Sequence, residues 1–379
     1  MDVHSMGAAA MDERALEAAV ELPPLVMRFG AFGDMVLLTV LLRQLHARFG
    51  KPVDVISSGP WTKPLLEGQP SVGRLFVVRS RRTPYWMSLD QRRLVAWLRK
   101  RGAGPTWFCD MHLGKDLLHR GRIPDEYICD SRSFEWVPGE GFADRYIRLA
   151  NESPAAFAGR LPAPHAAVSR AAQIVLTASA RAEADEWLAR RNLIGRSFIV
   201  VHPGSRHMAR RGLRSRAGSD KYWPEARWGL VIKTVRDLRP DHVILLSGTP
   251  KERKFNADIM AAAAVRGVHN VADDLPIRTL LPLLERAHSM ISVDTGPAHA
   301  AAALGCPTVA LFGTAPATLF RPGGETTRAI ALTGAVNGVQ NILGITAESV
   351  IAAWFDLIRS AEMPAAYSVK SLTCDRTAS

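Results

Sequence analysis

A strand, a glycine turn and a helix follow one another near the start of the chain, and a second strand comes directly after them. Leu25–Phe29 is a short apolar run of the kind found in buried strands. The turn Gly30–Asp34 (GAFGD) follows, and Met35–Phe49 has helical spacing that ends at Gly50. Val53–Ile56 is the next strand. This β-α-β opening requires a parallel sheet covered by helices, so it predicts a doubly wound α/β fold.

The alternation of strands and helices starts again in the second half of the chain, at Phe198–His202. Strands near Val243–Leu246, Met290–Val293 and Thr308–Phe312 are separated by helical patterns at Trp228–Arg239, Ala257–Ala264 and Ala298–Leu304. A chain of 379 residues is too long for one core and suits two domains. We expect a disordered extension (1–22), an N-terminal Rossmann-like domain (23–170), a C-terminal Rossmann-like domain (171–345), a final helix (346–362) and a disordered tail (363–379).

The net charge of +12 is concentrated in two segments. Arg79–Arg122 holds eleven Lys and Arg against three acidic residues, and Arg206–Lys221 holds six against one. Solvated surface charge explains any single one of these residues, but the clustering favours an anionic partner, either a phosphorylated substrate, a membrane surface or a nucleic acid. The basic segments lack the aromatic interleaving of stacking platforms and match no recognised nucleic-acid module, so we expect no nucleic-acid partner.

The chain has the features of a cytoplasmic protein. Its longest strongly apolar run, Met35–Leu42, is far shorter than a membrane span, and no secretory signal pattern opens the sequence. Cys109, Cys129, Cys306 and Cys374 form no CxxC pair, which favours ordinary thiols in a reducing compartment.

The first glycine turn places Asp34 at the start of a helix. The turn lacks the third glycine of the dinucleotide fingerprint, and the second strand ends without an acidic residue for a ribose, which argues against an NAD enzyme. No GxxxxGK[ST] motif is present, which argues against a P-loop NTPase. Asp34 could cap the helix, or it could act as a general base toward an acceptor hydroxyl.

The most specific pattern is Ser289–Gly313 (SMISVDTGPAHAAAALGCPTVALFG), which predicts strand, turn, helix and strand. Asp294 or Thr295 can cap this helix, and Thr295 and Gly296 would present N–H groups to an anion at its positive end. His299 lies one turn further on. It is either a structural histidine or a residue that contacts a sugar diphosphate.

Two further turns follow strands of the second half. VVHPGSR precedes Lys221, and Ser205 and Lys221 could neutralise a diphosphate, although a plain surface loop is the alternative. In SGTPKE, Glu252 could bind ribose hydroxyls at the carboxyl edge of the sheet, or it could simply be solvated. No DxD pair and no His/Asp cluster with metal spacing is present, so we expect neither a metal nor another cofactor.

Together these motifs resemble glycosyltransferase family 9, the ADP-heptose:lipopolysaccharide heptosyltransferases. The resemblance runs from about Leu25 to Ser360. It is carried by R-x-x-A/G-x-GD at Arg28–Asp34, HPGS at His202–Ser205, K-x-WP at Lys221–Pro224, SGTPKE at Ser247–Glu252 and VDTGPAH…ALGCPTVALFG at Val293–Gly313.

The resemblance implies a GT-B fold, in which two Rossmann-like domains face each other across a cleft, and inverting sugar transfer without a metal. It implies a nucleotide-sugar donor, ADP-heptose above all, and an anionic glycolipid acceptor reached at the inner-membrane surface. By position, Asp34 matches the general base and Glu252 a nucleotide contact. Ser205, Lys221, Thr295 and Gly296 match phosphate contacts, Asp294 and His299 match the sugar–phosphate end, and Gly33, Asp110, His112 and Lys115 lie on the acceptor side. The alternative is a nucleotide-sugar-binding protein without transferase activity, or a relative with another donor and acceptor.

Three features depart from the family pattern, the first being that Gly313–Pro316 (GTAP) lacks the acidic residue often expected after this strand. Met208–Asp220 looks like an arginine-rich insertion between two donor motifs, and we expect it to border the cleft. The segment Cys109–Lys115 follows the acceptor-side pattern only loosely.

Overall fold

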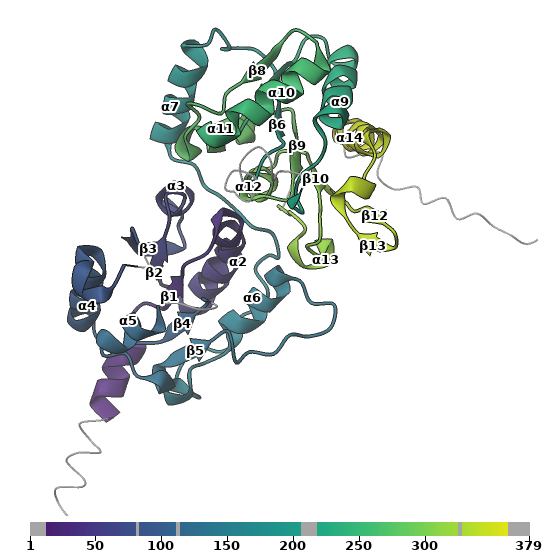
Figure 1. Cartoon of the computed structure of the whole chain (residues 1–379). Helices are drawn as coiled ribbons and strands as arrows, with labels where there is room; N and C mark the ends of the chain where they lie inside the picture. Colours follow the sequence, from purple (N-terminus) through teal and green to yellow (C-terminus); the bar gives the residue numbers. More distant parts are fainter. Residues whose placement is uncertain (1–12, 81–82, 111–113, 206–217, 325–327, 363–379) are drawn as a thin grey trace, which may run out of the picture.

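The computed structural model describes residues 13–80, 83–110, 114–205, 218–324 and 328–362. They form two α/β units, each built on a parallel sheet, and the first unit lies below the second in Figure 1. The predicted α/β class and the GT-B arrangement are therefore confirmed.

The sheet of the first unit has the order β3-β2-β1-β4-β5, and all its pairs are parallel. Its strands are β1 (Leu25–Arg28), β2 (Val53–Ser58), β3 (Val72–Val78), β4 (Thr106–Phe108) and β5 (Ile128–Asp130). The helices of this unit are α2 (Phe32–Phe49), α3 (Thr62–Leu66), α4 (Leu89–Arg101), α5 (Lys115–Arg120) and α6 (Phe142–Asn151). Because every strand runs in the same direction, the loops after β1, β3 and β4 all emerge at one edge of the sheet.

The sheet of the second unit has the order β11-β10-β9-β6-β7-β8, again with parallel pairs. Its strands are β6 (Phe198–His202), β7 (Val243–Leu246), β8 (Val268–Asn270), β9 (Ser289–Val293), β10 (Thr308–Leu311) and β11 (Ala329–Leu332). The helices are α7 (Ala178–Ala189), α9 (Glu225–Leu238), α10 (Arg253–Ala263), α11 (Ile277–Arg286), α12 (Gly296–Ala303), α13 (Ala317–Phe320) and α14 (Ala347–Glu362). A short hairpin joins β12 (Ala335–Val336) to β13 (Val339–Gln340).

The largest apolar cluster runs without a break from the first unit to the second. On α2 it includes Met35, Leu38 and Leu41, and on α12 it includes Ala300 and Ala301. The small side chains of α12 allow α2 to pack closely against it. The two helices that begin at the glycine turns therefore meet at the junction between the units.

The chain between α6 and α7 contains one 3-10 turn, Ala155–Phe157, and is otherwise irregular, and hydrogen bonds hold it against α2. The amide of Gln44 donates to the carbonyl of His165 at 2.7 Å, and Nε of Arg48 donates to the carbonyl of Pro162 at 2.9 Å. The predicted Pro- and Ala-rich linker thus has polar contacts with the first unit along its path.

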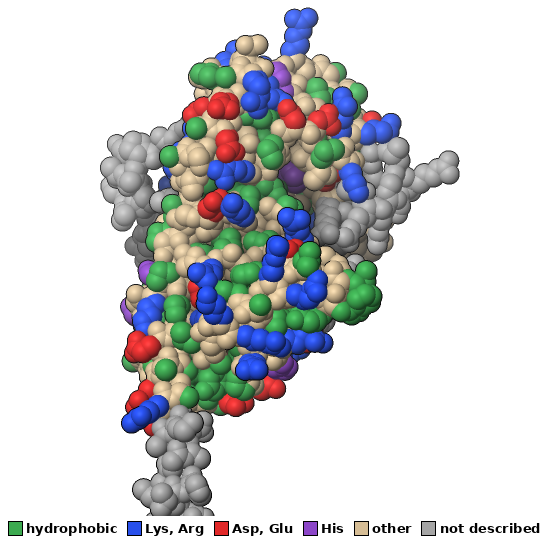
Figure 2. Space-filling model, turned by 90° about the vertical axis from the view of Figure 1, so that its left-hand side faces the viewer, with side chains coloured by type: hydrophobic (Ala, Val, Ile, Leu, Met, Phe, Trp, Pro, Cys, Tyr) green, Lys and Arg blue, Asp and Glu red, His purple; other side chains and the backbone are tan. Residues whose placement is uncertain are grey.

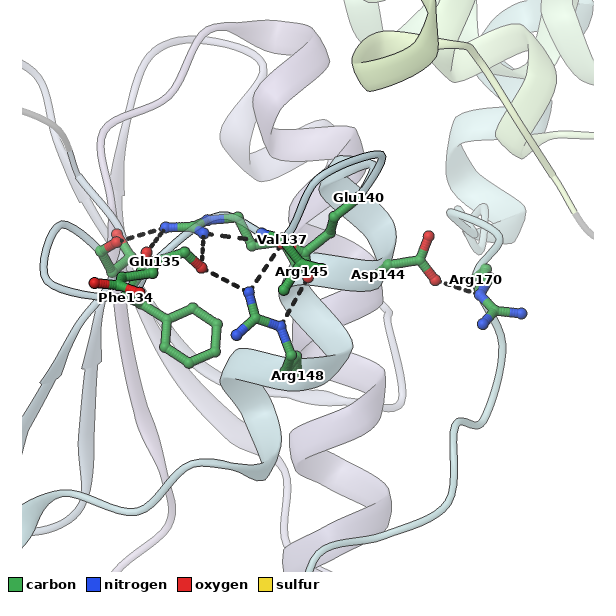
Figure 3. Close-up of polar contacts among 9 residues, drawn as sticks. Phe134, Glu135, Val137, Glu140, Asp144, Arg145, Arg148 and Arg170 are labelled. Carbon is green, nitrogen blue, oxygen red and sulfur yellow. Dashed lines mark hydrogen bonds and ion pairs between the residues drawn. The ribbon is translucent and has the colours of Figure 1, made fainter.

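Two arginines on α6 fix the loop that follows β5 (Figure 3). Arg145 donates to the carbonyls of Glu135, at 2.8 Å, and Phe134. Arg148 forms a two-point contact with Glu140, at 2.8 and 2.9 Å, and also donates to the carbonyl of Glu135. These contacts satisfy loop carbonyls that β-sheet pairing leaves unused. They hold the loop beside Phe142, whose ring lies 4.9 Å from that of Phe320 in the second unit.

The expected disordered extension at 1–22 is wrong for its second half. Residues 13–20 are helical, and Ala19 is buried. The reason is a close contact with the start of β4, where Gly104 leaves room for Leu22 and for the carbonyl of Ala19. Residues 1–12 and the tail 363–379 lie outside the described residues.

Candidate functional site

Asp34 occupies the third position of α2 and contacts the turn that precedes the helix. Its Oδ2 accepts a hydrogen bond from the N–H of Ala31 at 2.9 Å and lies 3.5 Å from Nη2 of Arg28. The capping role considered from the sequence is therefore present. The side chain is also 33% exposed, so the carboxylate can still be reached from outside.

Arg28, the first residue of the R-x-x-A/G-x-GD motif, was given no role from the sequence, yet it contacts the carboxylate of Asp34. Its side chain is largely buried, Nη1 donates to the carbonyl of Cys109, and Nε has no partner within the described part of the chain. Burial alone would lower the pKa of Arg28, but the charges of Tyr146 and Asp34 outweigh burial and raise it. A charged residue at the end of an otherwise apolar strand was the signal that could have revealed it.

The residues predicted on the acceptor side have different surroundings in the structure. Asp110 is buried, and its Oδ2 accepts from the N–H of Phe29 at 2.8 Å, which ties the loop after β4 to the loop after β1. Nζ of Lys115 lies 2.6 Å from Oδ1 of Asp125 and 3.3 Å from Oδ2 of Asp130, so two carboxylates already engage it. His112 lies outside the described residues.

Lys221, Asp294 and His299 form one cluster in the second unit. Nζ of Lys221 donates to Oδ2 of Asp294 at 2.9 Å and to its carbonyl at 2.6 Å. Nε2 of His299 lies 3.6 Å from Oδ1 of Asp294. Burial alone would raise the pKa of Asp294, but the contacts with His299 and Lys221 outweigh burial and hold it below its ordinary value. Asp294 is therefore a carboxylate between two nitrogen groups.

His299 has an unused polar atom. Its side chain is only 6% exposed, and its Nδ1 has no hydrogen-bond partner within the described part of the chain. A buried nitrogen without a partner costs free energy, so such an atom needs an explanation in a ligand or in bound water. Of the two interpretations left open by the sequence, this atom favours the one in which His299 contacts a ligand.

The open end of α12 faces the start of α2. A Cβ atom on Gly33 would lie 3.0 Å from Cδ2 of His299, and one on Gly296 would lie 2.5 Å from Cβ of Phe32. Asp34 follows Gly33 directly in the chain, so the base candidate belongs to the same junction. Thr295 precedes the helix as its N-cap, and Pro297 has no N–H, so the N–H groups at the open end come from Thr295 and Gly296.

Glu252 and the HPGS turn meet beside this junction. Oε2 of Glu252 accepts from the N–H and the hydroxyl of Thr249 at 2.7 and 2.8 Å, whereas Oε1 is buried and without a partner within the described residues. A Cβ atom on Gly204 would lie 2.3 Å from that Oε1, so any side chain at this position would force Glu252 to move. Ser205 is buried next to it. The solvated alternative for Glu252 is wrong, because the residue is 4% exposed.

The topology explains why these motifs come together. β6 pairs with β9, and His202 is in register with Ser292, so the loops after the two strands are neighbours. The insertion Met208–Asp220 lies outside the described residues except for its last three positions. There, Asp220 accepts a hydrogen bond from the hydroxyl of Thr314 at 3.1 Å, which attaches the end of the insertion to the loop after β10.

The described residues contain no group of three or more His, Cys, Asp or Glu that could hold a metal ion. Within the same residues, no helix is both long enough and apolar enough to cross a bilayer.

Comparison with known proteins places these features in a family. The sequence profile of glycosyltransferase family 9 (heptosyltransferase) matches residues 142–337. Lipopolysaccharide heptosyltransferase 2 of Salmonella typhimurium is 22% identical over 319 residues, 79% of this chain and 85% of that protein. Lipopolysaccharide heptosyltransferase 3 of Escherichia coli is 28% identical over 130 residues, 34% of this chain and 35% of that protein.

Two solved structures share the fold. The ADP-heptose lipopolysaccharide heptosyltransferase II of Escherichia coli superposes with a TM-score of 0.68 at 20% identity, over 90% of this chain and all of that one. A family 9 glycosyltransferase from Veillonella parvula superposes with a TM-score of 0.70 at 16% identity, over 89% of this chain and 98% of that one. The profile covers more than half of the chain, so this protein is a glycosyltransferase and belongs to family 9, the heptosyltransferase family of lipopolysaccharide biosynthesis.

Proposed function

We propose that this enzyme transfers a heptose from ADP-heptose to the core of a lipopolysaccharide acceptor by a single inverting displacement, without a metal. The observation that carries the proposal is the junction itself. Asp34 of the first unit adjoins Gly33, and Gly33 faces His299 and the open end of α12 in the second unit. The proposed general base and the proposed contacts of the leaving group therefore adjoin one another between the two units.

In the proposed reaction, the carboxylate of Asp34 takes the proton of the acceptor hydroxyl while that oxygen attacks the anomeric carbon. The guanidinium of Arg28 lies 3.5 Å from Oδ2 of Asp34 and balances the charge of that carboxylate. The carboxylate also accepts the hydrogen bond from Ala31, which fixes its orientation. The aligned carboxylate therefore needs no rearrangement before proton transfer.

The departing diphosphate binds at the N-terminal end of α12. An ammonium group has three N–H donors, and Lys221 uses two of them on Asp294, which leaves one for a phosphate oxygen. The N–H groups of Thr295 and Gly296 and the hydroxyl of Ser205 add further donors, and the helix terminus adds positive potential. Nδ1 of His299 would meet the sugar end of the donor, and Oε1 of Glu252 would accept hydrogen bonds from the ribose.

Purified protein, ADP-heptose and a lipopolysaccharide core acceptor test this function directly, with release of ADP as the readout. ADP release that depends on the acceptor and continues in EDTA supports the proposal. Binding of the donor without release, across a panel of core acceptors, would instead support a nucleotide-sugar-binding protein without transferase activity. Mass spectrometry of core oligosaccharide from a strain that lacks the gene would identify the missing sugar and its position.

A further inference from the structure

Three large apolar side chains protrude together from the first unit, within the basic segment Arg79–Arg122. Trp86 is 73% exposed, Met87 58% and Leu89 59%. They lie on the short turn Tyr85–Met87 and at the first position of α4. We call these three residues the apolar tip.

Hydrogen bonds and one cation–π contact fix the backbone around the apolar tip. The buried amide of Gln91 donates to the carbonyls of Ser80 and Thr83 at 3.0 and 2.8 Å. Oγ of Ser88 accepts from the N–H of Gln91 and caps α4. The guanidinium of Arg120 stacks over the ring of Tyr85 at 4.5 Å. Polar side chains of this turn are therefore used in internal hydrogen bonds, and its large apolar side chains face the solvent. This is the reverse of the usual arrangement.

Cations continue from the apolar tip along α4. The buried face of this helix consists of Leu94, Val95 and Leu98. Helical spacing places Leu89 on the opposite face, together with the exposed Arg92, Arg93, Arg99 and Lys100. Lys and Arg side chains crowd the lower half of the view in Figure 2, which holds the first unit, and apolar side chains lie among them.

We propose that the apolar tip and the basic face of α4 dock this enzyme on an anionic lipid bilayer. Trp and Leu side chains insert favourably at the level of the headgroups, and each Lys or Arg near an anionic surface adds about 1 kcal/mol. A second copy of the chain fits the surface less well, because a symmetric contact would bring the same cations together.

The position of the apolar tip agrees with this role. Residues 79–88 follow the carboxyl end of β3, and Asp34 follows the carboxyl end of β1 in the same parallel sheet. A bilayer at the apolar tip therefore lies along the sheet edge where an acceptor must approach Asp34. The biological purpose of docking rests on the proposed function, since a glycolipid acceptor is anchored in the membrane, but the docking itself can be measured without it.

Sedimentation with vesicles tests the docking. We expect the wild-type protein to bind vesicles of phosphatidylcholine and phosphatidylglycerol, to bind pure phosphatidylcholine vesicles weakly, and to be released by salt. Replacing Trp86, Met87 and Leu89 together with serine should weaken binding by about tenfold or more. Replacing Arg92 and Arg93 with serine should cost about fivefold for each cation.

A matched control removes three other exposed large apolar side chains, which belong to the second unit: Ile194, Leu230 and Leu238 to serine. This control should bind vesicles as the wild type does. Trp86→Phe offers a second measurement, because it should abolish most quenching of tryptophan fluorescence by brominated lipid while leaving sedimentation nearly unchanged.

The proposal is overturned if the wild type ignores the anionic vesicles, or if the control loses as much binding as the apolar-tip variant. It is also overturned if the apolar-tip variant changes only the oligomeric state in analytical ultracentrifugation, since the surface would then join two copies. ADP release with a lipid-free core acceptor should survive in the apolar-tip variant. If that release is absent from the wild type too, the proposed function fails while the vesicle result stands by itself.

Discussion

Lys221→Met tests the central cluster, because it removes the charge and keeps most of the aliphatic side chain. The carboxylate of Asp294 is only 9% exposed and would lose the cation that donates to it at 2.9 Å. Breaking a buried ion pair by removing one partner costs about 3–5 kcal/mol. His299 still contacts Asp294, so we expect the lower end, about 3 kcal/mol. For a unit of this size, that loss lowers the Tm by roughly 6–12 °C.

The loss should depend on pH in a defined direction. In the wild type, the lowered pKa of Asp294 contributes stability that is present above its ordinary value and is lost as the pH falls through the folded-state pKa. Removing Lys221 leaves burial opposed by His299 alone, so the pKa of Asp294 rises and the variant takes up a proton at a higher pH than the wild type. The Tm difference between the two proteins should therefore be largest at pH ~7 and should shrink as the pH falls toward and below the ordinary pKa of aspartate, about 3.9.

Thermal melts across this pH range check the expectation, and Lys233→Met, an exposed lysine on α9, is the control. The double variant Lys221→Met, Asp294→Asn should recover most of the stability, because no unpaired charge is left in the site. It should not recover ADP binding. We expect the loss of affinity for ADP to be ten- to a hundredfold larger than the loss of affinity for adenosine. A Tm difference that stays constant with pH would refute the reasoning about Asp294. Equal losses for ADP and adenosine would refute the phosphate contact of Lys221.

Three further changes test the other parts of the site. Asp34→Asn should fold normally and bind donor, because an amide oxygen can still accept from the N–H of Ala31, but its turnover should fall about a hundredfold or more. Turnover near that of the wild type would leave Asp34 as a helix cap and make Asp110 the next candidate for the general base. Glu252→Gln should weaken ADP and adenosine by the same factor, about tenfold, in calorimetric titrations, and a loss confined to ADP would contradict a ribose contact. Turnover should be unchanged after EDTA treatment, whereas restoration by a divalent ion would show that the reaction needs a metal.

The sequence predicted the long central elements and the motifs between them, because both leave strong local signals. α2 and the strands β1, β2, β6, β7, β9 and β10 all lie where apolar runs and glycine turns predicted them. The short strands β5 and β8 were not predicted. Each has three residues, and β5 forms only because β4 lies beside it, so the signal is in the partner and not in the segment.

The site shows the same limit. Lys221 and Asp294 were both predicted as donor contacts, but their pairing was not, since they lie 73 positions apart and only the β6–β9 neighbourhood brings them together. The burial of Glu252 could not be predicted either. It depends on Gly204, which leaves space for Oε1 in a different loop. The role of Arg28 could not be predicted, because its hydrogen bond to the carbonyl of Cys109 joins residues 81 positions apart.

The two glycines at the junction have a packing role that is independent of phosphate binding. Gly296 was predicted as a phosphate contact, yet a side chain there would also collide with Phe32, at 2.5 Å from its Cβ. Gly33 is restricted in the same way by His299. A substitution at either glycine would therefore disturb the contact between the units and the donor site at once, and its effect on turnover could not be assigned. Lys221, Glu252 and Asp34 separate the two roles better, because their side chains line the junction without forming the contact between α2 and α12.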